Sequence, residues 1–247
     1  MEKDIKLIAL DMDGTLINED GEVSTENEEA IKRAKANGIH VVLSTGRSLA
    51  TCQDISESLG RSSYIVTING GEIYDKEYNL VERNPLDADL VKRLWELKKT
   101  HDTHFWSSTA QGMFSSLEPF ESDIEAYEWL KFGFDIEDDE VRKVILDELR
   151  ENKALEVTNS SPTNIEINPA GVNKAAAIRK VCDWLDLSMD NVMAVGDSMN
   201  DLAMIREAGF GVAMGNAQEI VKKEADWVTL SNTDHGVSHA IRHVIDK

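Results

Sequence analysis

The sequence predicts an α/β fold, with a doubly wound, mostly parallel sheet and an α+β domain inserted into it. Strand and helix signals alternate over residues 1–82 and again over residues 169–247. Such alternation is typical of parallel strands joined by crossover helices that cover both faces of one sheet. Residues 83–168 have a different sequence pattern, with short aromatic-rich strands and amphipathic helical runs. The two ends of the chain are therefore expected to form one core, and the middle a smaller domain.

The first part of the core is predicted to contain three strands and two helices before a small hairpin. Apolar runs bounded by turn residues indicate the strands, and Thr25 with Glu28 resembles a capping box that opens the first helix. Gly38 and Gly60 mark the ends of the two helices. The predicted strands are 5–10, 39–43 and 64–68, the helices are 25–37 and 48–59, and a turn at 69–71 precedes the hairpin strands 72–74 and 78–81.

The inserted domain is predicted to begin with a helix that follows Pro85. Trp95, Trp106 and Trp129 are candidates to line a substrate pocket, but packing in the core of this domain is the preferred interpretation. The acidic stretch 135–140 is interpreted as a solvated loop. The predicted helices are 87–99, 122–130 and 139–151, and the predicted strands are 104–107, 113–115, 155–158 and 164–167.

The second part of the core returns to regular alternation after Gly171. Its predicted helices are 173–185, 200–207, 217–224 and 236–245, and its predicted strands are 192–195, 212–214 and 227–230. His235, His239 and His243 recur at every fourth position of the last helix, a spacing that resembles a zinc-binding stripe. Since no carboxylate or cysteine of matching spacing joins them, a solvated helix face is the preferred interpretation.

The charge balance restricts the classes of partner. The 247 residues include 26 Lys or Arg and 46 Asp or Glu, a formal net charge of −20, so neither nucleic acid nor an anionic membrane is an expected partner. The negative potential of this net charge would also repel a phosphorylated metabolite. A phosphate site here must therefore be made locally positive by a metal ion and a few Lys or Arg groups. The absence of a signal-peptide pattern and of a membrane-spanning apolar run predicts a cytoplasmic protein. Cys52 and Cys182 are interpreted as free thiols.

Two aspartates one residue apart, Asp11 and Asp13, follow the first predicted strand. Strands seldom end in unpaired carboxylates at a buried edge, because burying a charge without a partner is costly. Ligands of open α/β sheets bind beyond the carboxyl ends of the strands, so polar segments at those ends are expected to converge on one site. The other such segments are Thr45-Gly46-Arg47, the run from Gly196 to Asp201, and Lys174 at the start of a helix.

The residue types in these segments are typical of metal-assisted phosphoryl transfer. Carboxylate oxygens without His or Cys suit a hard cation such as Mg²⁺. Lys174 and the Thr45 hydroxyl could hold phosphate oxygens, and helix N-termini favour anions. Because residues i and i+2 leaving a strand point the same way, Asp11 is predicted to attack phosphorus, with Asp13 beside it. Asp13 would protonate the leaving oxygen and later deprotonate water.

In their order along the chain, the four segments resemble the four motifs of the haloacid dehalogenase-like (HAD) phosphohydrolase superfamily. The place of the insertion, Asn69-Gly70-Gly71 and the run from Val212 to Ala217 are similar to its Cof-type branch. The resemblance implies a Rossmann-like core, a cap over residues 83–168, an aspartyl-phosphate intermediate on Asp11 and Mg²⁺ as cofactor. It further implies Mg²⁺ ligands at Asp11, Asp13 (through its carbonyl) and Asp197, phosphate contacts at Met12 (backbone), Thr45, Gly46, Lys174 and Asn200, and a metal-adjacent carboxylate at Asp201.

One residue departs from the family pattern. Many relatives have glycine after the third-motif lysine, where this chain has Ala175. An alanine at a helix start is benign, so Lys174 keeps its expected role. The second aspartate, Asp13, argues against a dehalogenase, which lacks both it and the metal. A P-type pump carries threonine at that position and needs membrane helices, so it is excluded as well.

The sequence thus predicts a Mg²⁺-dependent phosphatase for small phosphorylated metabolites, with sugar phosphates as the expected substrates. Two alternatives share its motifs: a phosphomutase or phosphotransferase, and a flavin-pathway phosphatase acting on a phosphoribitylamino-pyrimidine. A non-catalytic metabolite sensor is disfavoured because Asp11, Asp13 and Asp197 are all retained. Arg47 is predicted either to touch phosphate or substrate, or to form a structural salt bridge, and Glu166 is a candidate for substrate contact. The physiological substrate and the oligomeric state stay open at this stage.

Overall fold

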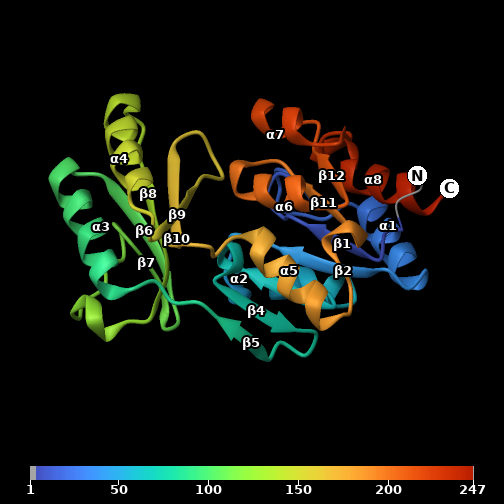
Figure 1. Cartoon of the computed structure of the whole chain (residues 1–247), viewed down its shortest axis with the longest axis horizontal. Helices are drawn as coiled ribbons and strands as arrows, with labels where there is room; N and C mark the ends of the chain where they lie inside the picture. The colour runs from blue at the N-terminus through green and yellow to red at the C-terminus, as the bar shows by residue number, and fades with distance from the viewer. Residues whose placement is uncertain (1–3, 247) are drawn as a thin grey trace. The chain divides into compact units, whose positions relative to one another are not determined.

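The computed structural model describes residues 4–246 (Figure 1). The chain divides into two compact units, a core unit formed by Met1–Glu82 with Lys174–Lys247 and an inserted unit formed by Arg83–Asn173. Each unit has its own sheet, and over residues 4–246 the core unit has two hydrophobic clusters and the inserted unit one. Over residues 4–246, none of the helices has the length and apolar character needed to cross a membrane.

The core unit is built on an eight-stranded sheet. Its strands are β1 (Leu7–Leu10), β2 (His40–Ser44), β3 (Tyr64–Thr67), β4 (Glu72–Asp75), β5 (Leu80–Arg83), β11 (Val192–Gly196), β12 (Phe210–Ala213) and β13 (Trp227–Val228). They lie in the order β13-β12-β11-β1-β2-β3-β4-β5. Pairings from β13 to β3 are parallel, whereas β4 pairs antiparallel with β3. This topology confirms the predicted α/β class, and it places β1 and β11 side by side near the middle.

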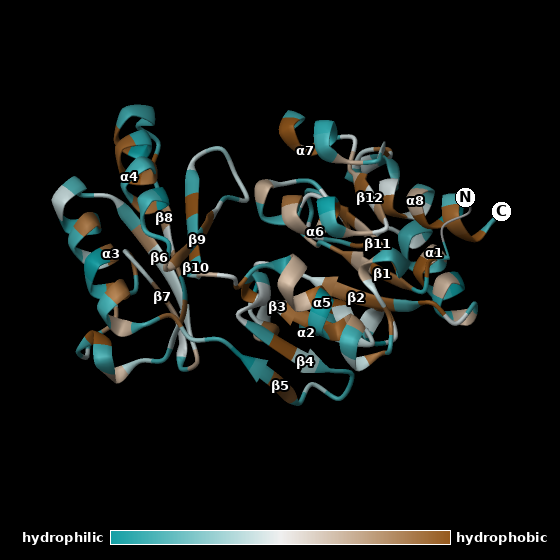
Figure 2. Cartoon of the chain, in the orientation of Figure 1, coloured by the Kyte–Doolittle hydropathy of each residue, from teal (hydrophilic) through white to brown (hydrophobic). Residues whose placement is uncertain are grey.

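Helices cover both faces of this sheet. They are α1 (Thr25–Ala36), α2 (Leu49–Ser58), α5 (Lys174–Trp184), α6 (Leu202–Glu207), α7 (Glu219–Glu224) and α8 (Gly236–Ile245). From β1, Ile8 and Leu10 pack in one cluster with α1 and α8, whereas Leu7 and Ala9 pack in a second cluster with α5. Because both faces are covered, a central strand needs no polar face. Figure 2 accordingly shows hydrophobic colour along the central strands.

Helix α1 is capped by Ser24 and not by Thr25. The Ser24 side chain accepts a hydrogen bond from the Asn27 backbone N–H at 3.3 Å, and Thr25 is the first helical residue. The predicted capping box of Thr25 and Glu28 is therefore wrong by one residue. Ser24 and Thr25 are both good N-cap residues, so the preference for a hydroxyl at this position does not select between them.

The inserted unit is an antiparallel five-stranded sheet with two helices. Its strands are β6 (His104–Thr109), β7 (Gly112–Ser115), β8 (Trp129–Asp135), β9 (Leu155–Thr158) and β10 (Asn164–Pro169), and its helices are α3 (Ala88–His101) and α4 (Asp139–Glu151). The sheet order is β7-β6-β8-β10-β9. Phe105, Phe132 and Phe134 share one cluster with buried residues of both helices. The helices alternate hydrophilic and hydrophobic colour in Figure 2, as amphipathic helices packed on one sheet face should.

The predicted helix over 122–130 is wrong. The structure has a short 3₁₀ helix, Ile124–Ala126, followed by β8, which is the central strand of the inserted sheet. The sequence of β8 obscures it because it contains a lysine and a glycine. Lys131 is buried against Glu166 from another strand, at 3.3 Å, and Gly133 lies under the Trp106 ring, where a Cβ would come within 2.2 Å of the ring. Both features depend on partners that are distant in sequence.

The acidic stretch 135–140 is only partly a loop. Asp135 ends β8, and Asp138 caps α4 by accepting hydrogen bonds from the backbone N–H groups of Glu140 and Val141. Among the three tryptophans, Trp95 and Trp129 pack in the cluster of the inserted unit, as predicted. Trp106 instead lies outside that cluster, with the Lys131 ammonium 4.7 Å from its ring centroid. The prediction for Trp106 is therefore wrong.

Both cysteines are free, as predicted, and both are buried. Burial raises the pKa of Cys52 to about 12 and that of Cys182 to about 11, so both thiols stay protonated near pH 8. We expect the native protein to react with Ellman's reagent at pH 8 far more slowly than the protein unfolded in guanidinium chloride. Two thiols should be titrated after unfolding. Rapid modification of the native protein would contradict the burial of these side chains.

Candidate active site

Three neighbouring strands of the core sheet carry polar groups to one edge. β1 leads into Asp11, β2 into Thr45 and β11 into Asp197, while Lys174 is the first residue of α5. Asp11 continues the pairing of β1 with β11 by donating its backbone N–H to the Val195 carbonyl at 3.0 Å. The four predicted segments therefore meet at the carboxyl ends of the strands, where ligands of open α/β sheets bind.

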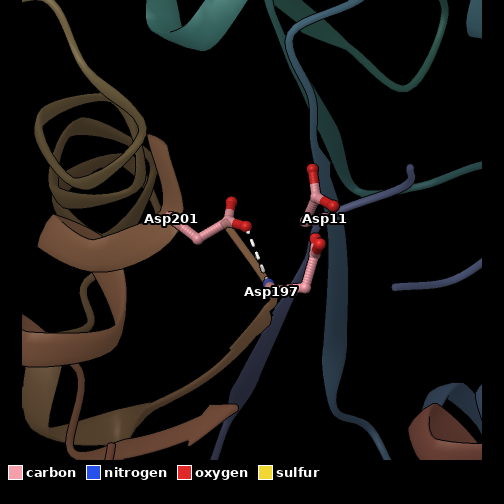
Figure 3. A group of neighbouring side chains, drawn as sticks. All are labelled: Asp11, Asp197 and Asp201. Atoms are coloured by element: carbon pink, nitrogen blue, oxygen red, sulfur yellow. Dashed lines mark hydrogen bonds between the residues drawn. The ribbon is translucent and has the colours of Figure 1, made fainter. Parts of the chain in front are cut away.

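Three carboxylates converge at this edge. Asp11, Asp197 and Asp201 each offer an oxygen, and these oxygens lie within 4.8 Å of one another (Figure 3). Such an all-oxygen donor set fits a hard cation such as Mg²⁺ better than zinc or copper. The side chain of Asp13 is not part of this group. That arrangement is compatible with the expectation that Asp13 would offer a metal only its carbonyl.

Lys174 is buried between two of the carboxylates. Its Nζ donates to Asp11 Oδ1 at 2.5 Å and to Asp201 Oδ1 at 2.6 Å, and the side chain is fully enclosed. Burial opposes the ammonium charge, but the carboxylates of Asp11 and Asp201 outweigh it and raise the pKa of Lys174 above its usual range. The lysine is therefore charged and fixed, and it holds Asp11 in place.

The group carries an excess of negative charge. Burial, followed by the Asp201 charge, raises the pKa of Asp11 well above that of a free aspartate, against the opposing effect of Lys174. Burial and the Asp201 charge likewise raise the pKa of Asp197 to about 6. Three ionised carboxylates around one ammonium leave two charges uncompensated, which a divalent cation would balance. Cation binding and protonation therefore compete at this site.

Asp201 holds the loop after β11. Its Oδ1 accepts from Lys174, and its Oδ2 accepts from the backbone N–H groups of Asp197 at 2.9 Å and Ser198 at 3.1 Å. A Cβ on Gly196 would lie 2.4 Å from the Asp201 carboxyl carbon, so a glycine is required there. With both oxygens engaged in this way, Asp201 positions the loop and the lysine.

Two hydroxyl residues orient Asp197, and neither was assigned a role from the sequence, although Ser198 lies within the predicted run from Gly196 to Asp201. Thr15 Oγ1 donates to Asp197 Oδ1 at 3.2 Å, and Ser198 Oγ donates to Oδ2 at 2.9 Å. Thr15 is fully buried despite its hydroxyl, and it follows directly on the Asp11–Gly14 run. Its place directly after Asp11, Asp13 and Gly14 was the available signal.

Gly14 gives a direct test of this geometry. Its φ is +77°, and a Cβ there would lie 2.6 Å from Asp197 Oδ2. We expect Gly14→Ala to lower the free energy of unfolding by about 2 kcal/mol or more and to weaken Mg²⁺ binding measured by calorimetry. Gly21 is the matched control, because it has a φ of +78° and a Cβ there would meet nothing within 4 Å. Gly21→Ala should lower the free energy of unfolding but leave Mg²⁺ affinity unchanged. Equal Mg²⁺ affinities in the Gly14→Ala and Gly21→Ala variants would refute the predicted clash with Asp197.

Asp13 is paired with Arg47. Arg47 Nη2 donates to Asp13 Oδ1 at 2.6 Å, and Arg47 Nε donates to Asp13 Oδ2 at 2.9 Å. The two side chains thus form a bidentate salt bridge at a partly exposed position. The hydrogen bond to Asp13 raises the pKa of Arg47 further, so the guanidinium stays charged. Of the two predictions for Arg47, the structure shows the salt bridge.

The remaining predicted phosphate contacts lie around the same edge. Thr45 is buried, and its Oγ1 accepts from the Arg47 backbone N–H at 3.1 Å, with Gly46 between them. Asn200 lies on the short 3₁₀ helix Met199–Asp201 and is 7% exposed. Met12 lies between the two aspartates, with its side chain buried in the core cluster.

Two other predictions concern residues elsewhere. Glu166 belongs to the inserted unit, on β10, where it contacts Lys131 and accepts from Ser160 Oγ at 2.6 Å. The three histidines have separate surroundings. His235 contacts the Ser24 hydroxyl and lies 3.5 Å from Glu26 Oε2, and His239 contacts the Thr229 hydroxyl. The His243 ring stacks on Trp227 with centroids 4.6 Å apart.

Comparison with known proteins gives consistent matches over the whole chain. A family model described as haloacid dehalogenase-like hydrolase matches residues 8–128 and 118–241. The 5-amino-6-(5-phospho-D-ribitylamino)uracil phosphatase YcsE of Bacillus subtilis is 56% identical over 240 residues, covering 97% of this chain and 96% of the relative. The phosphoglycolate phosphatase of Methanobrevibacter smithii is 29% identical, covering 98% and 99%. The solved structure of a haloacid dehalogenase-like hydrolase from B. subtilis superimposes with a TM-score of 0.89 at 27% identity, covering 98% of this chain and all of the other.

Proposed function

Because this chain belongs to the haloacid dehalogenase-like hydrolase family and is a phosphatase, we propose that it hydrolyses 5-amino-6-(5-phospho-D-ribitylamino)uracil or a closely related ribityl phosphate. The observation that carries the reaction type is the buried arrangement of Asp11 against Lys174, with Asp197 and Asp201 beside them. The substrate rests on the relative that is 56% identical over nearly the whole chain. This identity favours the flavin-pathway alternative over the expected sugar phosphates.

Asp11 is the proposed nucleophile. One carboxylate oxygen attacks phosphorus, the bond to the leaving alkoxide breaks, and an aspartyl phosphate forms on Asp11. The hydrogen bond from Lys174 at Oδ1 leaves Oδ2 as the attacking oxygen. In the second step a water oxygen attacks the same phosphorus and inorganic phosphate is released, which restores the Asp11 carboxylate.

Asp13 is the proposed proton carrier. It gives a proton to the leaving alkoxide in the first step and takes one from the attacking water in the second. Both of its oxygens are engaged by Arg47 in the structure, so this pair has to open before Asp13 reaches the reacting oxygens. We propose that Arg47 then contacts the phosphoryl group or the substrate.

Mg²⁺ is the proposed cofactor, held by the Asp11 and Asp197 carboxylates and the Asp13 carbonyl. When bound, it would offset the negative charge of the carboxylates and of the phosphoryl group. The Met12 backbone, Thr45, Gly46, Lys174 and Asn200 are the proposed contacts of the phosphoryl oxygens. Asp201 supports them through Lys174 and the loop after β11.

The inserted unit is the proposed cap that selects the substrate. The sequence predicted a cap over residues 83–168, and Glu166 is its proposed substrate contact. Glu166 is held rigidly by Lys131, Ser160 and Asn164, so it would present a fixed acceptor. The enzyme is proposed to act in the cytoplasm, in keeping with its two free cysteines.

The experiment is a comparison of kcat/KM across a panel of phosphomonoesters. The panel contains the ribitylaminouracil phosphate, several sugar phosphates and phosphoglycolate, each assayed with Mg²⁺ and with a chelator. We expect the ribitylaminouracil phosphate to have the highest kcat/KM, and the chelator to abolish turnover. A sugar phosphate at the top of the panel would overturn the substrate proposal. Isomerised sugar phosphate without free phosphate would instead identify a mutase.

A further inference from the structure

The loop between β3 and β4 has an unusual backbone. Ile68, Asn69 and Gly70 follow one another with φ values of 52°, 57° and 101°. A β-branched residue such as Ile68 is rarely found in this left-handed region, because its branched side chain crowds the backbone. Ile68 and Asn69 are nonetheless almost fully enclosed, at 1% and 3% exposure. The surrounding structure therefore maintains a conformation that the local sequence disfavours.

This loop contacts the segment after β2 through its backbone. The Ile68 N–H donates to the Arg47 carbonyl and the Asn69 N–H donates to the Thr45 carbonyl, each at 2.9 Å. These two hydrogen bonds join the left-handed turn to that segment. The strained turn thus fixes the backbone on both sides of Gly46, where the phosphoryl group is proposed to bind.

The Asn69 side chain contacts the other end of the site. Asn200 Nδ2 donates to Asn69 Oδ1 at 3.3 Å, across 131 positions of sequence. The Asn200 amide is buried, and its Oδ1 has no hydrogen-bond partner among residues 4–246. The bond to Asn69 therefore fixes the orientation of the Asn200 amide. If that amide were rotated by 180°, Asn200 Oδ1 would face Asn69 Oδ1, and two acceptors would oppose each other. The second N–H of Nδ2 then has a defined direction.

We propose that Asn69 is a positioning residue for phosphate binding, one that aligns the Thr45–Arg47 backbone and the Asn200 amide together. It acts through these residues and does not itself need to touch the phosphoryl group. The inference rests on the proposed roles of Thr45, Gly46 and Asn200. Asn69 suits both tasks, since asparagine tolerates left-handed backbone and its carbonyl oxygen accepts the amide hydrogen.

Two substitutions separate the backbone task from the side-chain task. Asn69→Gly keeps the left-handed backbone accessible and removes the acceptor for Asn200. Asn69→Ala removes the acceptor and also strains the backbone. We expect Asn69→Gly to weaken inorganic phosphate binding about tenfold in calorimetry with Mg²⁺ present, the effect of one lost hydrogen bond. Asn69→Ala should weaken it further and lower the melting temperature.

A double-mutant cycle tests whether Asn69 acts through Asn200. In an Asn200→Ala background, Asn69→Gly should change phosphate affinity by less than about twofold, because the amide that it orients is already gone. In kinetics, Asn69→Gly should raise KM for the ribitylaminouracil phosphate more than it lowers kcat. Asn79→Gly makes the same change at an exposed position between β4 and β5, where the amide contacts only Asp75 in the described hydrogen bonds, and it should change neither quantity.

The outcomes distinguish this inference from the proposed function. The role of Asn69 would be overturned in either of two cases. One is that the effects of Asn69→Gly and Asn200→Ala on phosphate affinity are independent, so that their fold-changes multiply in the double variant. The other is that a folded Asn69→Gly variant has unchanged phosphate affinity. Phosphate affinity is measured without turnover, so that result stands even when the wild-type enzyme prefers another phosphomonoester. Failure of the wild-type chain to hydrolyse any phosphomonoester would overturn the proposed function instead.

Discussion

Asp11→Asn is expected to lower kcat at least about a thousandfold, because the amide oxygen cannot form the proposed phosphoenzyme that divides the reaction into two steps. Asparagine has nearly the same shape and can still accept the hydrogen bond from Lys174, so the fold should persist. The measurement is steady-state release of phosphate from p-nitrophenyl phosphate and from the ribitylaminouracil phosphate. Acid quenching with radiolabelled substrate should trap label on the wild-type protein and none on the variant.

The control for this substitution is Asp54→Asn, which makes the same charge change at an exposed position of α2. It should keep wild-type kcat and KM. Circular dichroism of both variants should match that of the wild-type protein. Substantial Mg²⁺-dependent turnover by a folded Asp11→Asn protein would show that another residue attacks phosphorus.

Lys174→Met is expected to have the largest effect on stability. Removing one partner of a buried ion pair leaves the remaining charge uncompensated, a loss of about 3–5 kcal/mol. Here Asp11 and Asp201 both lose the same ammonium group. Urea unfolding should give a lower midpoint, with the loss greater at pH 8 than at pH 5. The sign follows because the pKa values of Asp11 and Asp197 are raised, so these carboxylates are neutralised as the pH falls, whereas at high pH their charges repel.

Added Mg²⁺ should restore part of the lost stability, since a divalent cation offsets the same carboxylates. Lys32→Met, at an exposed position of α1, is the matched control and should change the unfolding midpoint little. A Lys174→Met variant as stable as the wild-type protein at pH 8 would contradict the buried charge arrangement described above.

Local sequence carries much of this fold and part of this site. The apolar run at β1 and the polar residues directly after it depend only on neighbours in sequence, so α/β class and the segment of Asp11 and Asp13 were predictable. The start of α5 at Lys174 was predictable for the same reason. These features follow one rule. The strands of a buried parallel sheet are apolar, and polar residues follow at their carboxyl ends, where ligands bind.

The errors occur where a residue is explained by a distant partner. Strand β8 was missed because Lys131 is buried only through Glu166, which lies 35 positions away. Thr15 orients Asp197 across 182 positions, and Asn69 meets Asn200 across 131. No window of sequence contains both members of such a pair. The cap of α1 failed for another reason, since Ser24 and Thr25 offer the same hydroxyl chemistry.

The course of the chain between the two units has a consequence for how the protein can diversify. The core unit is left after Glu82 and re-entered at Lys174, and Glu82 forms an ion pair with Lys180 of α5. The departure and return points are thus joined to each other within the core, and Lys174 is fixed by two aspartates. The intervening residues can therefore vary in length and sequence without shifting Lys174. A chimera that takes residues 83–173 from a relative should keep the reaction and exchange the substrate, which makes the two junctions natural sites for recombination.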